Sequence, residues 1–269
     1  MDMTQNKCCR HGANLRRKRR RHRKIRHSVI FLCSSIAVIV FVAVGSSMIR
    51  SGDGRTNRYD VEAGNNTYDN AVIENSKISG KNKIQNNQSM LDDIMNSTQY
   101  PKQLKDLALK NEEALEFVYD YPAEHVKEHT IDLTEEASMD SVPLFVQWDK
   151  RWGYEKYSGN FFAASGCGPT TLSMVVVYLT HNRDASPIAV AKYSKEAGYS
   201  VDGSGSSWTL ISEGCMHYGV KAKAVALDES RMKAELDEGH PIVVNVGPGD
   251  FTDTGHFMVI TGYDDEGFQ

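Results

Sequence analysis

Apolar residues are distributed along the chain in one long run and several shorter patterns. The long run covers residues 28–49, where 22 uncharged positions are dominated by Val, Ile, Phe and Ala. A helix of this length measures about 33 Å at about 1.5 Å per residue, which is enough to cross the hydrocarbon core of a membrane. The pattern therefore predicts a transmembrane helix over residues 28–49.

The shorter patterns lie between residues 101 and 263. They place helices first and strands last, which is typical of an α+β arrangement. Helices are expected at 101–121, from Cys167 onward, and at 187–197, 208–218 and 231–238, and strands at 221–227, 241–246 and 256–263. Ser186 and Ser207 are expected to cap two of these helices, and Gly239 to end another.

Polar residues dominate the stretch between the long run and the first helix. Residues 51–99 contain nine Asn and few aromatic residues, too little apolar surface to order a chain. We therefore expect a disordered stalk over residues 50–100. A helical segment and an acidic connector follow over residues 101–140. The apolar residues of the helical part favour packing of residues 101–128 against residues 141–269, and the alternative is a mobile helix within the stalk.

Charge separates the two ends of the chain. Residues 1–27 contain 11 Lys or Arg against Asp2 alone, a net charge of +10, so the total of −4 leaves −14 for the remainder. By the positive-inside rule, residues 1–27 form a cytoplasmic tail, residues 28–49 a signal-anchor, and everything after Arg50 lies outside a single-pass cell-membrane protein. A cleaved signal peptide is the alternative. Nucleic-acid binding is not expected, because membrane orientation and anionic headgroups account for the arginine run.

A cysteine stands at the expected start of a helix, within the stretch Ser165-Gly166-Cys167-Gly168-Pro169. Proline suits a first helical turn, and the positive end of the helix dipole favours a thiolate. Such a position lowers a thiol pKa from about 8.5 to roughly 3.5–7.5, which predicts a nucleophile. The alternative is a buried structural cysteine.

The other cysteines do not form a disulfide framework. Cys8 and Cys9 would be cytoplasmic and Cys33 would lie in the membrane, which leaves Cys167 and Cys215 outside. A bond between these two would remove the nucleophile, but Cys215 occupies a helical pattern where a small buried residue is expected. The chain shows no metal-type Cys/His spacing, so no metal or cofactor is expected.

A histidine stands at the entry of the last strand. His256 follows Gly255 and precedes the apolar run Phe257 to Ile260. A histidine in this position is often structural, but together with a cysteine at a helix N-terminus it becomes a candidate general base.

Three segments together resemble the papain-like cysteine peptidases, in the branch of the bacteriocin-leader peptidases and their stand-alone relatives, with a peptidase C39-like domain. They are residues 143–154, 165–170 and 255–263. The resemblance implies a catalytic helix packed on an antiparallel sheet, with Cys167 as nucleophile, His256 as general base and acid, and Gln147 as oxyanion donor. Gln147 precedes Cys167 by 20 residues, so residues 151–164 are expected to loop out.

The predicted function is that of a membrane-anchored, extracytoplasmic bacterial cysteine peptidase that hydrolyses peptide or isopeptide bonds. Its expected partners are a peptide or cell-wall peptide substrate and, through one N-terminal helix, the membrane. The alternative is a non-catalytic cell-surface or cell-wall binding module that keeps a papain-like shell. The sequence carries no signal for an oligomeric state.

The resemblance also implies a third residue, Asn or Asp, on the strand after the histidine strand. Asp264 follows His256 by eight residues, about 26 Å along an extended strand, which is too far to orient its ring. A hairpin centred between Asp265 and Glu266 would place about position 275 opposite His256. We therefore expect the third residue beyond Gln269, and a peptidase domain over residues 141–269 that is incomplete at its C-terminal side.

Overall fold

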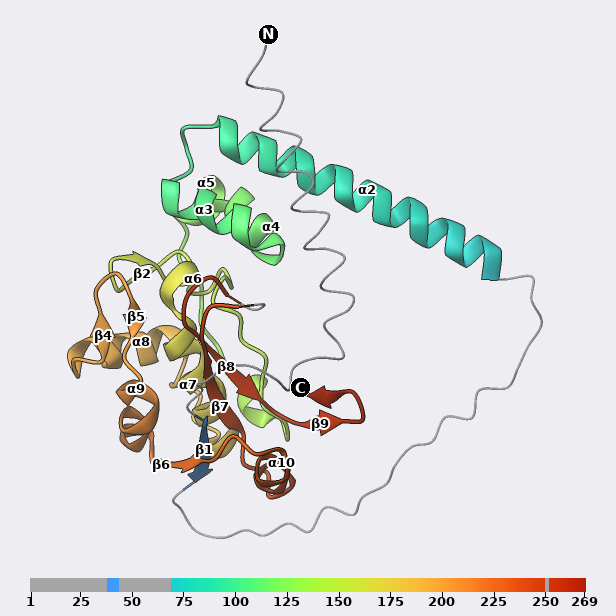
Figure 1. Ribbon diagram of the computed structural model, residues 1–269. Helices are drawn as coiled ribbons and strands as arrows, with labels where there is room; N and C mark the ends of the chain where they lie inside the picture. The colour runs from blue at the N-terminus through green and yellow to red at the C-terminus, as the bar shows by residue number, and fades with distance from the viewer. Residues whose placement is uncertain (1–37, 44–68, 250–251) are drawn as a thin grey trace.

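The computed structural model describes residues 38–43, 69–249 and 252–269 (Figure 1). Its α-helices are α2 Asp69–Asn96, α3 Lys102–Lys110, α4 Leu115–Tyr119, α5 Tyr121–Glu124, α6 Phe162–Ser165, α7 Cys167–Thr180, α8 Pro187–Glu196, α9 Thr209–Ser212 and α10 Glu229–Asp237. Three 3-10 helices are η2 Glu112–Ala114, η3 Glu136–Ser138 and η4 Gly214–Tyr218. The strands are β1 Val38–Ala43, β2 Lys156–Tyr157, β3 Asn160–Phe161, β4 Ser200–Val201, β5 Gly205–Ser206, β6 Val220–Val225, β7 Ile242–Val246, β8 His256–Ile260, β9 Tyr263–Asp264 and β10 Gly267–Phe268.

The main sheet has the strand order β6-β1-β7-β8 and is antiparallel throughout. Strand β8 lies at one edge, where His256 pairs with Val246 and Phe257 with Asn245. Side chains alternate between the two faces of a strand. Val243 and Phe257 belong to the core cluster that contains α7, whereas Ile242 clusters with residues of α10. Helices α7 and α10 therefore cover opposite faces of the sheet, and the α+β prediction is confirmed.

Strand β1 lies within the stretch that the sequence predicts as a membrane helix. Six residues of the predicted membrane helix, Val38–Ala43, form a strand between β6 and β7. Five of the six are Val, Ile or Phe, residue types that favour strands, and pairing on both sides satisfies their backbone groups. The remaining positions of 28–49, and the expected cytoplasmic tail, lie outside the described residues. Among the helices that the structure describes, none is both long and apolar enough to cross a membrane.

The expected disordered stalk is also corrected for its second half. Helix α2 covers Asp69–Asn96 and extends away from the rest of the molecule (Figure 1). Its last turns supply Met90, Leu91 and the fully buried Ile94 to an apolar cluster with α3 and α4. These three residues share one helical face and bury together, which offsets the polar composition of the rest of the stretch.

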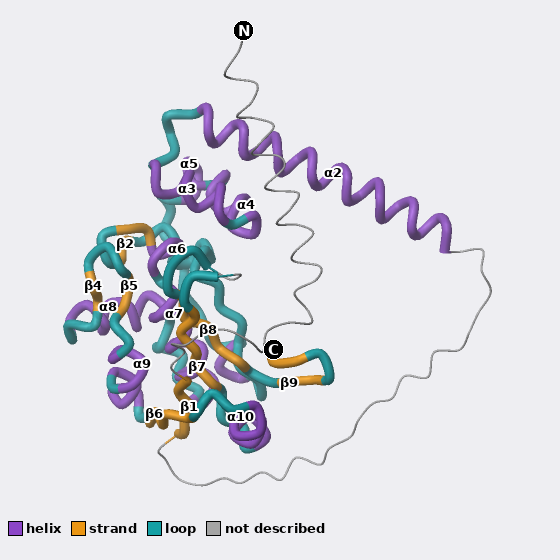
Figure 2. The backbone as a smooth tube through the Cα atoms, viewed as in Figure 1, coloured by secondary structure: helices purple, strands orange, loops and turns teal. Residues whose placement is uncertain are grey.

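Helices α2 to α5 form a group that packs on the part of the chain that follows them. Leu104, Phe117 and Val118 share one buried cluster with Phe161 and Ala163, which lie just before α7. Figure 2 shows this group, α2 to α5, as helical, whereas the strands of the main sheet lie in the other part of the molecule. Proline does not end the segment at Tyr121–Pro122 as expected, because it occupies the first turn of α5, where a missing N–H costs nothing.

Most of the other predicted elements are confirmed with small shifts. The Ser186 hydroxyl accepts a hydrogen bond from the N–H of Ala189 at 3.3 Å and caps α8. The helix expected at 208–218 is instead divided into α9 and η4, and Ser207 does not cap it, because its hydroxyl pairs with that of Thr209 at 2.7 Å. The last strand ends at Ile260, before the β9–β10 hairpin.

Candidate active site

Cys167 is the first residue of α7, as the sequence predicts. Two neighbouring glycines allow this position. A side chain on Gly166 would place its Cβ 2.5 Å from the ring of Phe162, and one on Gly168 would place its Cβ 2.7 Å from the hydroxyl of Ser206. The start of α7 is therefore in close contact with α6 on one side and with β5 on the other.

A network of hydroxyl groups supports the turn before Cys167. The Ser165 hydroxyl donates to the carbonyls of Tyr157 at 2.8 Å and Phe161 at 3.0 Å. The Tyr157 hydroxyl is hydrogen-bonded to Ser206 at 2.6 Å and to Ser194 at 2.8 Å. Sequence reasoning missed this network, because its members are up to 49 residues apart and follow no motif.

The start of β8 lies against the start of α7. The Cys167 thiol accepts hydrogen bonding from the backbone N–H of Phe257, the residue that follows His256. The Phe257 ring stacks on Trp208, with ring centroids 5.5 Å apart and planes at 16°. The structure therefore brings together the two segments that carry Cys167 and His256, which are 89 residues apart in the sequence.

The protonation states at this site differ from the expected thiolate. Burial raises the pKa of the Cys167 thiol, and hydrogen bonding from the N–H groups of Phe257, Gly168 and Cys167 itself opposes this only in part. Burial lowers the pKa of His256, whose ring has no hydrogen-bond partner among the residues that the structure describes. Loss of solvation outweighs the helix dipole, so both groups are neutral at neutral pH.

Gln147 lies immediately beside the segment that leads into Cys167. Its side-chain amide donates to the carbonyl of Ala163 at 2.7 Å, four residues before Cys167. The expected insertion, residues 151–164, contains the β2–β3 hairpin and most of α6, and it folds back so that its two ends meet. A primary amide has two N–H donors, so one remains for a further acceptor.

Residues 139–269 match the family model described as Peptidase_C39 like family. This part of the chain is a peptidase C39-like domain. The match confirms the resemblance to papain-like peptidases seen in the sequence, and it begins two residues before the expected boundary at 141. No curated protein and no solved structure matches the chain.

Cys167 and Cys215 are the two free cysteines of the C39-like domain. The possible bond between them is therefore not formed. Cys215 is fully buried in η4, and burial raises its pKa to about 11. Cys215 can therefore serve as a control thiol in experiments that modify or replace Cys167.

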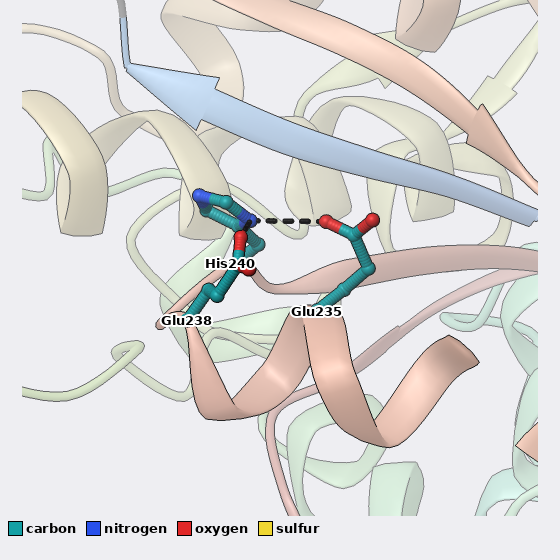
Figure 3. A group of neighbouring side chains, drawn as sticks. All are labelled: Glu235, Glu238 and His240. Atoms are coloured by element: carbon teal, nitrogen blue, oxygen red, sulfur yellow. Dashed lines mark hydrogen bonds and ion pairs between the residues drawn. The ribbon is translucent and has the colours of Figure 1, made fainter. Parts of the chain in front are cut away.

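One group of potential metal ligands occurs among the described residues of the C39-like domain, at the end of α10 (Figure 3). His240 Nδ1 lies 3.1 Å from a carboxylate oxygen of Glu235 and 3.5 Å from one of Glu238. The other Glu235 oxygen pairs with Lys223 at 2.7 Å, which lowers the pKa of Glu235. Glu235 already has Lys223 as a partner, so we interpret the group as a network of side-chain hydrogen bonds and ion pairs at the end of α10.

The raised pKa of Cys167 leads to a direct prediction. In the C39-like domain the thiolate ultraviolet absorbance of Cys167, taken as the difference from a Cys167→Ala chain, is expected to be absent at neutral pH. It should appear only above the ordinary thiol pKa of about 8.5, because burial favours the neutral thiol. A thiolate signal that persists below pH about 6 would show instead a preformed thiolate–imidazolium pair.

Proposed function

We propose that the C39-like domain is a cysteine peptidase that hydrolyses peptide or isopeptide bonds through Cys167 and His256. The observation that carries the proposal is the hydrogen bonding of the Cys167 thiol to the N–H of Phe257. It fixes the thiol beside the strand that starts with His256. The N-terminus of α7 and the neighbouring Gln147 amide supply the further groups that acyl transfer needs.

The proposed reaction begins with both groups neutral. The His256 ring, neutral because burial lowers its pKa, takes the proton of Cys167 as the sulfur attacks the carbonyl carbon. The oxyanion of the tetrahedral intermediate accepts hydrogen bonds from the backbone N–H of Cys167 and from the Gln147 amide. The imidazolium then protonates the leaving amine, which leaves a thioester on Cys167. Water activated by His256 hydrolyses this thioester and restores the thiol.

Replacement of His256 tests this scheme. Alkylation of Cys167 by iodoacetamide at neutral pH is expected to be about 100-fold slower in His256→Ala, because the neutral thiol loses its base. The two rates should converge above the pKa of Cys167, where the thiol ionises unaided. Mass spectrometry of the labelled cysteine measures both rates.

His240→Ala is the matched control, since His240 belongs to the ion-pair network at the end of α10. This variant should label like the wild type. Equal rates in His256→Ala and the wild type at neutral pH would contradict the proposal.

One observation favours a second candidate, a non-catalytic cell-surface or cell-wall binding module. The Cys167 thiol is kept protonated by burial, and the His256 ring lacks a hydrogen-bond partner among the described residues. In a binding module neither group would need activation. This candidate predicts that Cys167→Ala binds cell-wall fractions as the wild type does and that the wild type releases no peptide from them.

The proposed substrate is a secreted or cell-wall peptide, and the proposed location is the outer side of the cell membrane. Support for the location comes from the basic residues 1–27 beside 22 uncharged positions. A membrane helix over 28–49 and strand β1 cannot be present in the same molecule. A measurement that decides whether β1 belongs to the sheet therefore also bears on the anchor.

A further inference from the structure

We propose that Phe117 of α4 is a positioning residue for Gln147, so that the helical segment before the C39-like domain forms part of its active site. This inference rests on the proposed function, because it concerns the oxyanion donor of that reaction. It goes beyond it in assigning a role to residues outside the matched domain. Phe117 lies 22 residues before the start of the matched region at residue 139.

The first contact joins Phe117 to Gly153. A Cβ on Gly153 would be 2.7 Å from the Phe117 ring, so this ring packs directly on the glycine backbone. The same ring stacks on the next side chain, Tyr154, with centroids 4.2 Å apart and planes at 14°. The Tyr154 hydroxyl donates to the Phe117 carbonyl at 2.8 Å. Residues 153 and 154 are therefore held on α4 by both stacking and a hydrogen bond.

Ala163 connects Gly153 to Gln147 by two hydrogen bonds. The Gly153 carbonyl accepts a hydrogen bond from the N–H of Ala163 at 3.0 Å, and the Ala163 carbonyl accepts one from the Gln147 amide at 2.7 Å. Ala163 is fully buried in the same cluster as Phe117. A shift of Gly153 would thus be transmitted through one buried residue, Ala163, to the amide of Gln147.

Further contacts join the helical segment to the same loop. Lys150 pairs with Asp120 at 2.7 Å, and this partner raises the pKa of Lys150. The Tyr121 ring meets Phe161 edge to face at 5.7 Å. Phe117 is 4% exposed, so its contacts with the loop exclude water. The segment therefore restrains the loop near both of its ends.

Two reactions of Cys167, acylation and alkylation, distinguish a displaced Gln147 from a general loss of structure. Acylation of Cys167 by an ester develops an oxyanion and needs the Gln147 amide in place. Alkylation by iodoacetamide displaces iodide at an sp³ carbon and develops no oxyanion. A displaced donor should therefore slow acylation and leave alkylation unchanged.

The experiment compares Phe117→Leu with the wild-type full chain, with p-nitrophenyl acetate as the acylating probe and iodoacetamide as the alkylating probe. Acylation of Cys167 is expected to fall about 10-fold or more, with alkylation unchanged. In a Gln147→Ala background the added Phe117→Leu change should have no further effect on acylation. Phe117→Tyr, which keeps the stacking ring, should retain most of the acylation rate.

Ile94→Ala is the control for stability. Ile94 is fully buried in the same cluster, but it lies on α2, which packs on α3 and α4. It should lower the unfolding temperature without slowing acylation. Acylation that is unchanged in Phe117→Leu, that falls together with alkylation, or that falls again in the Gln147→Ala background would overturn the inference. A wild-type chain whose Cys167 reacts with neither probe would overturn the proposed function itself.

Discussion

Replacing Cys167 by serine is expected to reduce peptide hydrolysis on the order of 10⁶-fold, the scale of losing a triad nucleophile. A serine hydroxyl is far less acidic than a thiol, and His256 has its pKa lowered by burial, so it is too weak a base to compensate. Burial already keeps the Cys167 thiol neutral, and it would keep the less acidic serine hydroxyl neutral as well. Turnover of a cell-wall peptide fraction, followed by release of new amino groups, measures the loss.

Cys215→Ser is the matched control for this experiment. Cys215 is the other free thiol, fully buried in η4, and it takes no part in the proposed chemistry. Its replacement by serine buries a hydroxyl and should lower stability, while turnover per folded molecule stays near that of the wild type. Equal activity of Cys167→Ser and Cys215→Ser would assign the hydrolysis to a different group.

Replacing Val40 by proline is expected to destabilise the domain by at least about 2 kcal/mol. Val40 is in the middle of β1 and pairs with Lys223 of β6 and Ile242 of β7. Proline has no N–H for the ladder, and its fixed φ does not fit an extended strand. The change should lower the urea midpoint of the full chain in detergent and, for a domain of this size, the unfolding temperature by about 4–8 °C.

Val40→Ile keeps the backbone N–H and a β-branched side chain, so it should unfold like the wild type. If the proline variant also unfolds like the wild type, β1 does not belong to the sheet in solution. That outcome would leave residues 28–49 free to form the proposed membrane anchor. A loss of stability would mean that the C39-like domain depends on a strand from outside its matched region.

Local chemistry made much of the site predictable. The helix start at Cys167 follows from Pro169 two residues later, and the Ser186-Pro187 pair predicts the start of α8. The turn after β9 follows from Asp265 and Glu266, and the register Gly267 with Asp264 confirms its centre. Each of these features depends on the backbone preferences of a few neighbouring residues, and these preferences can be inferred from the residue types.

The pKa of Cys167 could not be predicted in the same way. Its position at a helix N-terminus favours the thiolate, and this effect depends on α7 alone. The opposing effect, burial, depends on how β8 closes over the thiol. Desolvation is a property of the packed molecule, so no local pattern reports it.

By itself the sequence determined the α+β class, the position of the cysteine helix, the strand that begins at His256 and the membership of residues 139–269 in the C39-like family. These depend on short-range spacing and on motifs. Only the tertiary structure decided the conformation of Val38–Ala43, because an apolar β-branched run suits a membrane helix and a central strand alike until β6 and β7 offer two unpaired edges. The place of Gln147 was decided in the same way. The hydrogen bond from Gln147 to Ala163 depends on a loop that folds against Phe117. Such packing between residues far apart in the sequence cannot be predicted from local sequence patterns.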